Sequence, residues 1–289
     1  MFDRLLEKVG KNKVIVVVAA LAILDVLVYI HLLARNPNIT TYFLDVGQGD
    51  SALVRLEGTV DVLIDGGPPN NRVVRALGDV LPFIDRYIDV VLITHVQSDH
   101  IGGLVEVLRR YNVGVVLWNG VGAETAVFQE LYRIIQERDI PFIVVGVGDT
   151  LCYRSSCFIV LAPSEMLKSA SDINNTSVVV LLKNQDISFL FTGDISTRVE
   201  RLLREQYYLS VDVLKVAHHG SRYSSSEAFL SAIRPKVAVI SVGRNSYGHP
   251  TSETLKRLAN VGAQVLRTDM HGTVRIVLDK QTLHISKGR

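Results

Sequence analysis

Short apolar runs alternate with polar turns along most of this chain. Runs rich in Val, Ile and Leu that are closed by glycine or by a charged residue are typical of strands. They predict strands at residues 40–44, 51–56, 60–64, 88–93, 113–117, 141–145, 177–182, 187–192, 211–216, 236–242, 264–268, 273–278 and 282–286. Helical spacing predicts helices at residues 71–86, 104–111, 124–138, 224–233 and after Thr251. This mixture predicts a single α/β or α+β domain.

Turns and one capping pattern mark the element ends. Residues 45–50, DVGQGD, make a hairpin of the first two strands, and residues 184–186 make another. Ser224 followed by Glu227 matches a capping box, which predicts a helix start at Ser224.

Residues 14–33 differ from the rest because they are almost continuously apolar. Twenty residues suffice to cross about 30 Å of hydrocarbon as a helix. Asp25 costs about 2.5–3.5 kcal/mol, but each Val, Ile or Leu contributes about 0.3–0.6 kcal/mol, and there are fourteen of them. We therefore predict a transmembrane anchor within residues 1–37, followed by the main domain at 38–289. A cleaved signal peptide is the alternative.

Flanking charge predicts the orientation of this anchor. Lys8, Lys11 and Lys13 precede the span and only Arg35 lies close after it. The positive-inside rule then places the N-terminus in the cytoplasm and the main domain outside, as a single-pass membrane protein. Asp25 is either a tolerated defect or a contact with another membrane helix.

The composition is that of a folded protein, with 48% hydrophobic and 21% charged residues among 289. Cys152 and Cys157 are its only cysteines. Across a tight hairpin they would form a disulfide in an oxidising compartment, and the alternative is a pair of free thiols.

Candidate chemistry is concentrated at predicted strand ends. The segment 94–103, THVQSDHIGG, places His95, Asp99 and His100 directly after a strand. Imidazole and carboxylate ligate zinc, manganese or iron, so this loop is a candidate metal site. Taken alone, the loop has one alternative interpretation, a strand end with a few polar residues. Further acids and histidines follow other runs, namely Asp65, Asp194, His218, His219 and His249.

Together these segments resemble a known family. DVGQGDS at 45–51, IDGG, NNTS at 174–177, TGD and VAHHGS are similar to the metallo-β-lactamase superfamily, most of all to the catalytic domain of ComEC-type DNA-uptake competence proteins. The resemblance covers about residues 38–285 and implies a four-layer αββα sandwich, here preceded by one transmembrane helix. The multi-helix channel of that family is not matched, so we expect a module that works with a separate DNA-channel protein.

The resemblance also implies a metal site that holds one or two divalent ions, zinc or manganese. Its ligands would be His95, Asp99, His100, Asp194 and His218. The superfamily pattern is His-x-His-x-Asp-His, and Gln97 stands at the second histidine position. The third histidine of the first metal site is replaced near Asn175, which leaves the second metal site as the better supported one.

Further residues receive catalytic or binding roles from this resemblance. Asp99 and His100 belong to the catalytic set, and Asp65 either orients a ligand or caps its turn. His219 would donate a proton to the leaving oxygen. Predicted substrate contacts are Asn175, Lys215, Ser221, Arg222 and His249, for which capping or structural roles are the alternative.

Charge is unevenly distributed between the two halves of the main domain. Residues 200–289 contain fourteen Lys and Arg against seven Asp and Glu, whereas residues 38–199 contain twelve against nineteen. A basic half suits sequence-independent contact with a phosphate backbone, although a solvated basic face is equally consistent. The leading hypothesis is a membrane-anchored, metal-dependent phosphodiesterase or nuclease that degrades single-stranded DNA outside the cytoplasm. The alternatives are a hydrolase of another phosphodiester or ester, and a metal-poor module that binds DNA or a channel.

Overall fold

The computed structural model describes residues 13, 15–26, 38–57, 60–82, 84–184, 187–279 and 282–288. Residues 15–26 are helical and exposed. Among the described residues, no helix is long and apolar enough to cross a bilayer. The other residues of the predicted span, 14 and 27–33, lie outside the described part of the chain.

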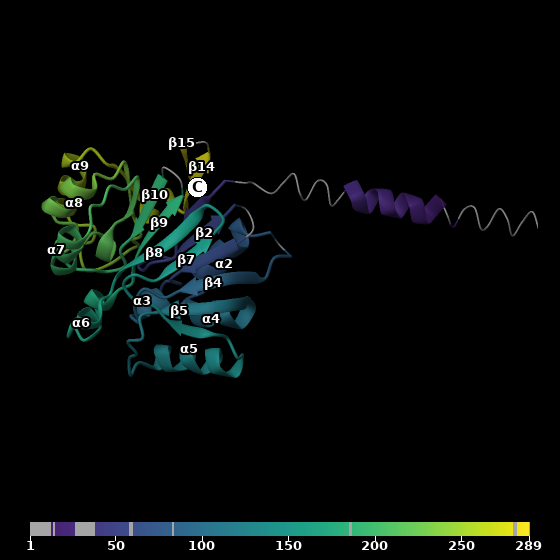
Figure 1. Ribbon diagram of the computed structural model, residues 1–289, viewed down its shortest axis with the longest axis horizontal. Helices are drawn as coiled ribbons and strands as arrows, with labels where there is room; N and C mark the ends of the chain where they lie inside the picture. The colour runs from purple at the N-terminus through teal and green to yellow at the C-terminus, as the bar shows by residue number, and fades with distance from the viewer. Residues whose placement is uncertain are drawn as a thin grey trace, which may run out of the picture.

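Two sheets stack face to face in the main domain (Figure 1). The first has the strand order β15-β14-β1-β2-β3-β4-β5-β6, and the second has the order β13-β12-β11-β10-β9-β8-β7. The first sheet comprises β1 (Thr40–Phe43), β2 (Ala52–Leu56), β3 (Val60–Ile64), β4 (Tyr87–Leu92), β5 (Asn112–Trp118), β6 (Phe142–Val144), β14 (Val274–Asp279) and β15 (Thr282–Lys287). The second comprises β7 (Thr150–Tyr153), β8 (Ser156–Ala162), β9 (Val179–Asn184), β10 (Ile187–Phe191), β11 (Val213–Lys215), β12 (Val237–Ile240) and β13 (Gln264–Arg267).

Helices cover the outer face of each sheet (Figure 1). On the first sheet lie α2 (Arg72–Val80), α3 (Ser98–Ile101), α4 (Leu104–Arg110) and α5 (Ala126–Glu137). On the side of the second sheet lie α6 (Glu165–Lys168), α7 (Thr197–Gln206), α8 (Glu227–Ile233) and α9 (Ser252–Asn260), and shorter turns are η1 (Ile173–Thr176), η2 (Ala217–Gly220) and α10 (Thr268–His271). The two-sheet α/β sandwich predicted from the sequence is confirmed.

Alternate side chains of a single strand can pack into two different hydrophobic cores, as β9 shows. In β9 and the residue before it, Val178, Val180 and Leu182 enter the core between the sheets, whereas Val179 and Leu181 enter the core under the helices. Successive side chains of a strand point to opposite faces, so an unbroken apolar run is the sequence of a strand buried on both sides.

Several element boundaries differ from the sequence-based expectation. The helix predicted at 71–86 ends at Val80. The helix expected to start at Ser224 is capped by Ser226, whose Oγ accepts a hydrogen bond from Phe229 N, because the Ser224 hydroxyl instead donates to the buried carbonyl of Ile195. Helix α7 was not predicted.

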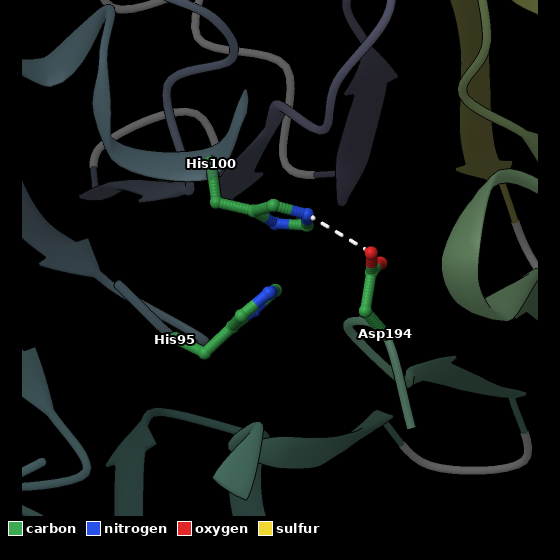
Figure 2. Close-up of side chains that lie close together, drawn as sticks. All are labelled: His95, His100 and Asp194. Carbon is green, nitrogen blue, oxygen red and sulfur yellow. Dashed lines mark ion pairs between the residues drawn. The ribbon is translucent and has the colours of Figure 1, made fainter. Parts of the chain in front are cut away.

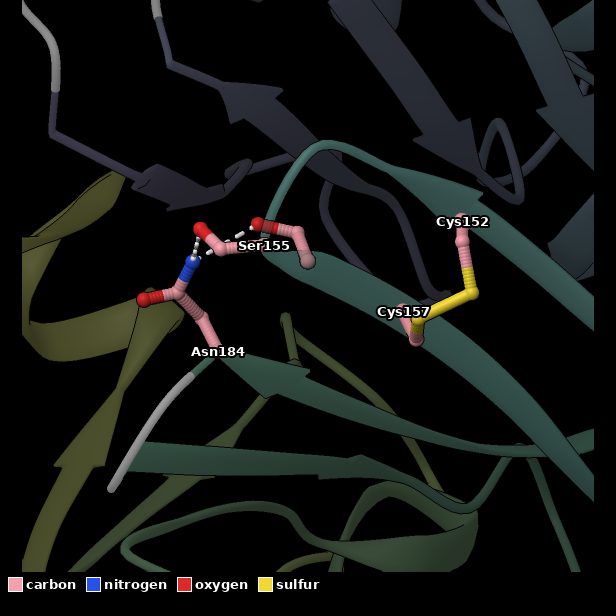
Figure 3. Close-up of a disulfide and its surroundings, with 5 residues drawn as sticks. Cys152, Ser155, Cys157 and Asn184 are labelled. Carbon is pink, nitrogen blue, oxygen red and sulfur yellow. Dashed lines mark hydrogen bonds between the residues drawn. A yellow bond between two sulfur atoms is a disulfide. The ribbon is translucent and has the colours of Figure 1, made fainter.

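A disulfide joins Cys152 and Cys157 across the β7–β8 hairpin, which confirms the predicted pairing (Figure 3). Beside it, the Asn184 side-chain amide donates to the hydroxyl oxygens of Ser155 and Ser156, each at 2.9 Å. The tip of the hairpin is therefore tied both to itself and to the neighbouring strand β9.

Candidate metal centre

The candidate ligands lie at strand ends that meet at one edge of the sandwich. Asp65 directly follows β3, His95 follows β4 after two residues, and Asp194 follows β10 after two residues. His218 and His219 lie in η2, after β11. Strands β3 and β4 are parallel, as are β10 and β11, so their carboxyl ends share an edge in each sheet.

Two loops pack tightly to bring Asp99 and His100 to this edge. The short helix α3 carries both residues directly after the His95 loop. Gly66 N donates to His100 O at 2.7 Å, and Gly103 N donates to Gly67 O at 2.9 Å. A Cβ atom at Gly103 would collide with the carbonyl oxygen of Gly66, so glycine is required for this close approach.

The centre of the cluster is formed by His95, His100 and Asp194, all of them buried (Figure 2). His100 Nε2 lies 3.4 Å from Asp194 Oδ2, and the two imidazole rings are 4.1 Å apart between centroids. One ligand atom from each residue lies within 4.8 Å of the others. A single ion placed between them would be within reach of all three.

His219 extends the cluster on its other side. Its Nε2 lies 3.2 Å from Asp99 Oδ2 and 3.7 Å from Asp194 Oδ2. Asp99, His100 and His219 form a second group of potential ligands, and Asp50, Asp194 and His219 form a third. The predicted ligand His218 lies further out, with Nε2 at 3.9 Å from Asp194 Oδ2.

A buried carboxylate orients the imidazole of His100, and a backbone carbonyl orients that of His219. Asp65 Oδ2 lies 2.8 Å from His100 Nδ1, and Asp65 also accepts hydrogen bonds from Thr94 N at 2.8 Å and Thr94 Oγ1 at 2.7 Å. His219 Nδ1 donates to Ser241 O at 2.9 Å. With Nδ1 engaged in both rings, each Nε2 faces the cluster, which is the arrangement that metal-binding histidines adopt.

The charges of the cluster favour a bound cation. Burial by itself would lower the pKa of His100, but the carboxylates of Asp194 and Asp65 outweigh it and raise this pKa well above its ordinary value. Burial has the same opposing effect on His219, where Asp194 and Asp50 raise the pKa to about 10. The pKa of His95 is lowered by burial and by the neighbouring positive charge of His100. The carboxylates around His100 and His219 therefore favour positive charge beside the Nε2 atoms of these two residues.

The side chains fit a divalent metal ion. Within the described residues, His100 Nε2 and both carboxylate oxygens of Asp194 are buried without a hydrogen-bond partner. Such atoms cost about 1–3 kcal/mol each unless something else satisfies them. Mixed imidazole and carboxylate ligands suit zinc and manganese. Gln97 Oε1 lies 3.2 Å from His95 Nε2, so the glutamine occupies the side of His95 where the superfamily pattern has a further histidine.

A cleft of about 560 Å³ gives access to the cluster. Asp99 and His218 line it with side chains that are 35% and 30% exposed. His249 and Tyr247 form the rim, with ring centroids 5.8 Å apart, and His249 lies 5.7 Å from His218. A substrate in this cleft would meet imidazole groups beside the metal ligands.

The remaining predicted substrate contacts are placed differently from one another. Arg222 is exposed and its guanidinium lies over the Tyr223 ring. Asn175 is buried, and its Oδ1 accepts hydrogen bonds from the amide and hydroxyl groups of Ser196. Ser221 is also buried.

The geometry does not support Lys215 as a phosphate contact. Lys215 is buried and its ammonium donates to Asp50 Oδ2 at 2.5 Å and to Val216 O at 3.0 Å. Asp50 and Val216 are themselves buried, so these contacts hold the ammonium inside the protein. The predicted proton donor His219 is buried but lines the cleft, and the more exposed His218 lines it as well.

The Asp50–Lys215 pair is the part of the site that the sequence reasoning missed. Asp50 Oδ1 lies 3.2 Å from His219 Nδ1, so the pair contacts the candidate metal ligand His219 at the ring nitrogen opposite Nε2. The available indication was a lysine within the apolar run VLKV at residues 213–216, because an interior lysine requires a buried anion.

A two-sheet sandwich with a buried histidine and carboxylate cluster at its strand ends defines a metal-dependent hydrolase type of domain. Comparison with known proteins agrees with this fold. The sequence profile of the metallo-β-lactamase superfamily matches residues 44–122. The solved structure of Igni18, a novel metallo hydrolase from Ignicoccus hospitalis, aligns with a TM-score of 0.56 at 17% identity, over 83% of this chain and 100% of that one.

Curated relatives narrow the assignment. ComE operon protein 3 of Bacillus subtilis is 32% identical over 80% of this chain and 32% of its own length. Competence protein ComA of Neisseria gonorrhoeae is 33% identical over 82% of this chain and 32% of its own length. The chain thus spans about a third of the length of these relatives. It belongs to the metallo-β-lactamase superfamily, and within that superfamily it resembles part of the competence proteins.

Proposed function

We propose that this protein is a metal-dependent phosphodiesterase that cleaves single-stranded DNA in a DNA-uptake system. The observation that carries the proposal is the set of buried ligand atoms on His100 and Asp194 that lack a hydrogen-bond partner among the described residues, beside a cleft lined by imidazoles. The competence proteins among its relatives support DNA as the substrate.

The residues that would hold a divalent ion are His95, His100, Asp194, Asp99 and His219. Such an ion, when bound, supplies Lewis-acid chemistry: it makes water more acidic and stabilises negative charge on phosphoryl oxygens. Asp65 keeps His100 in one orientation through the 2.8 Å contact at Nδ1. The Asp50–Lys215 pair and Ser241 O do the same for His219.

His218 is the residue that we assign to proton transfer. Its imidazole lines the cleft next to the cluster, so Nε2 can donate a proton to the oxygen that leaves phosphorus. General acid catalysis contributes about 10²–10⁴-fold to such reactions. Replacement by glutamine should slow DNA cleavage by that factor, but should slow hydrolysis of a nitrophenyl phosphodiester far less, because nitrophenolate leaves without a proton.

Cleavage of DNA is the direct test of the function. The full chain in detergent should cut a single-stranded oligonucleotide when manganese or zinc is added and should not cut it in EDTA. Asp99→Ala should abolish cleavage. If no divalent metal supports cleavage of DNA, a panel of other phosphodiesters and esters decides between a different substrate and a domain that only binds.

We also propose that residues 14–33 anchor the protein in a membrane, with the main domain outside the cytoplasm. The apolar run and the excess of lysines before it support this orientation. The Cys152–Cys157 disulfide is consistent with an oxidising compartment. Protease added outside intact cells should digest the main domain, and protection of that domain would contradict the proposed topology. A separate DNA channel in the same membrane is the proposed partner.

A further inference from the structure

A second cavity lies on the other side of the loop that borders the catalytic cleft. This β1–β14 pocket has a volume of about 660 Å³ and is formed by β1, α2, β14 and the end of β15. The loop at residues 45–50 separates the two spaces, since Asp45 lines the pocket and Gln48 lines the cleft. The Cα atoms of these two residues are three peptide units apart, which is at most about 11 Å.

The separating loop is held firmly at both ends. Asp45 N donates to Thr273 Oγ1 at 3.1 Å, and Gln48 Oε1 accepts from Gly243 N at 3.2 Å. Gly47 has a φ of +85°, and a Cβ at this position would lie 2.9 Å from Arg72 Nη1. The guanidinium of Arg72 therefore packs directly against the loop backbone, so the pocket has a defined wall.

Positive charge predominates in the pocket. Four cationic side chains line it, those of Arg72, Arg75, Arg275 and Lys287, against the carboxylates of Asp45 and Asp79. Arg72 lies 3.8 Å from Asp45. The other three cations form no ion pair within the part of the chain that the structure describes.

Arg275 adds an independent indication of a ligand. Its guanidinium lies 5.9 Å from the centroid of the Tyr42 ring, and its Nε is buried without a hydrogen-bond acceptor. A buried donor that lacks an acceptor is costly, and a ligand oxygen would satisfy it. Guanidinium groups recognise phosphate oxygens through paired hydrogen bonds. The pocket is therefore suited to a phosphate group.

The register of β1 distinguishes between two sources of phosphate. Thr40 pairs with Val277 at one end of β1, and Phe43 pairs with Val274 at the other. The pocket lies at the Phe43 end, beside the cleft, whereas the predicted membrane anchor precedes the Thr40 end. A strand of nucleic acid leaving the cleft would reach the pocket more directly than would a lipid headgroup.

We propose that the β1–β14 pocket binds a backbone phosphate of single-stranded DNA at a position beyond the cleavage site. The choice of DNA as the ligand rests on the function proposed above. Because the contact is to the backbone, binding in the pocket is independent of base sequence.

The test measures binding without cleavage. A fluorescent oligothymidylate is titrated with the full chain in detergent and EDTA, and anisotropy gives Kd over a range of salt concentrations. The variants are the original chain, Arg75→Gln combined with Lys287→Gln, and the control Arg198→Gln, which removes an exposed arginine on α7. Each lost phosphate contact should make the slope of log Kd against log salt shallower by about 0.7, which at 0.1 M salt is about fivefold in Kd.

Because both side chains would contact the same phosphate, the double variant should bind about fivefold more weakly at 0.1 M salt, and the control should bind within twofold of the original chain. Equal losses in the control and the double variant, or no loss in the double variant, would overturn the proposal. A competition with short-chain phosphatidylglycerol gives a further outcome. If this lipid displaces the oligonucleotide from the original chain but not from the double variant, the pocket binds lipid and the proposal is overturned. Hydrolysis of a nitrophenyl phosphodiester, measured separately with metal, tests the catalytic function, so the failure of either proposal is recognised on its own.

Discussion

The buried pair of Asp50 and Lys215 gives the sharpest test of how the site is supported. Their side chains are only 6% and 5% exposed, and the ammonium lies 2.5 Å from the carboxylate. Removing one partner of a buried ion pair typically costs about 3–5 kcal/mol, because the remaining charge is left uncompensated. We therefore expect Asp50→Asn and Lys215→Met to destabilise the fold strongly.

The surroundings predict that the two substitutions are unequal. In Lys215→Met, Asp50 keeps a second cationic neighbour, because His219 Nδ1 lies 3.2 Å from Oδ1. In Asp50→Asn, the ammonium of Lys215 retains only the amide oxygen and the Val216 carbonyl. The loss of unfolding free energy should lie near 5 kcal/mol for Asp50→Asn and near 3 kcal/mol for Lys215→Met. For a domain of this size, that is a fall in Tm of about 6–20 °C.

Thermal and urea unfolding of the metal-free protein measure these values, and the double variant completes the cycle. It should be more stable than Asp50→Asn, because no unpaired charge remains, with a coupling energy of about 2 kcal/mol or more. Burial alone would raise the pKa of Asp50, but Lys215 and His219 lower it from 3.8 to about 2. A lowered carboxyl pKa stabilises the fold above pH 3.8, so the coupling should vanish as the pH falls towards 2. Additive effects, or a coupling that does not change with pH, would refute this account.

Further predictions concern the metal ligands and the disulfide. Asp194→Asn should lose bound metal, measured by elemental analysis, and reduce hydrolysis at least about 100-fold while the circular dichroism spectrum is retained. Asp65→Asn should weaken metal binding about 10–100-fold in a chelator competition, because it removes the partner of a ligand rather than a ligand; an unchanged affinity would contradict that role. Gln97→His should raise the metal content per chain, and no increase would show that other residues limit the first metal site. Replacing Cys152 and Cys157 together by serine should lower the unfolding free energy by about 2 kcal/mol in urea titrations, since only a short loop is closed.

Sequence reasoning recovered those features that local patterns encode. An apolar run followed by His95, Asp99 and His100 predicted both a buried strand and the residues at its end. The two sheets and the helices outside them likewise follow from segments that are apolar throughout or on one side. These features depend on neighbours in the sequence, which a reader of the sequence can see.

Features that depend on distant partners were not recoverable. The apolar residues around Lys215 indicate an interior lysine, but they do not indicate that its anion is Asp50, 165 residues away in the chain. The capping residue of α8 was misplaced because three consecutive serines, 224–226, offer equivalent hydroxyls and only tertiary contacts distinguish them. Helix α7 was missed because charged residues dominate it and its apolar face is short, with Val199 and Leu203 buried and Leu202 partly buried.

The backbone conformation at His218 and His219 places two identical side chains in different surroundings. Both residues have left-handed dihedral angles, with φ of 50° and 52°. Non-glycine residues pay roughly 1–2 kcal/mol for this conformation, and such strain persists only where surrounding contacts enforce it. Here Ser241 O and Asp50 hold His219 inside the cluster, which turns His218 outwards into the cleft, with the two rings inclined by 74°. The strained turn therefore lets one dipeptide supply both a buried ligand and an accessible imidazole.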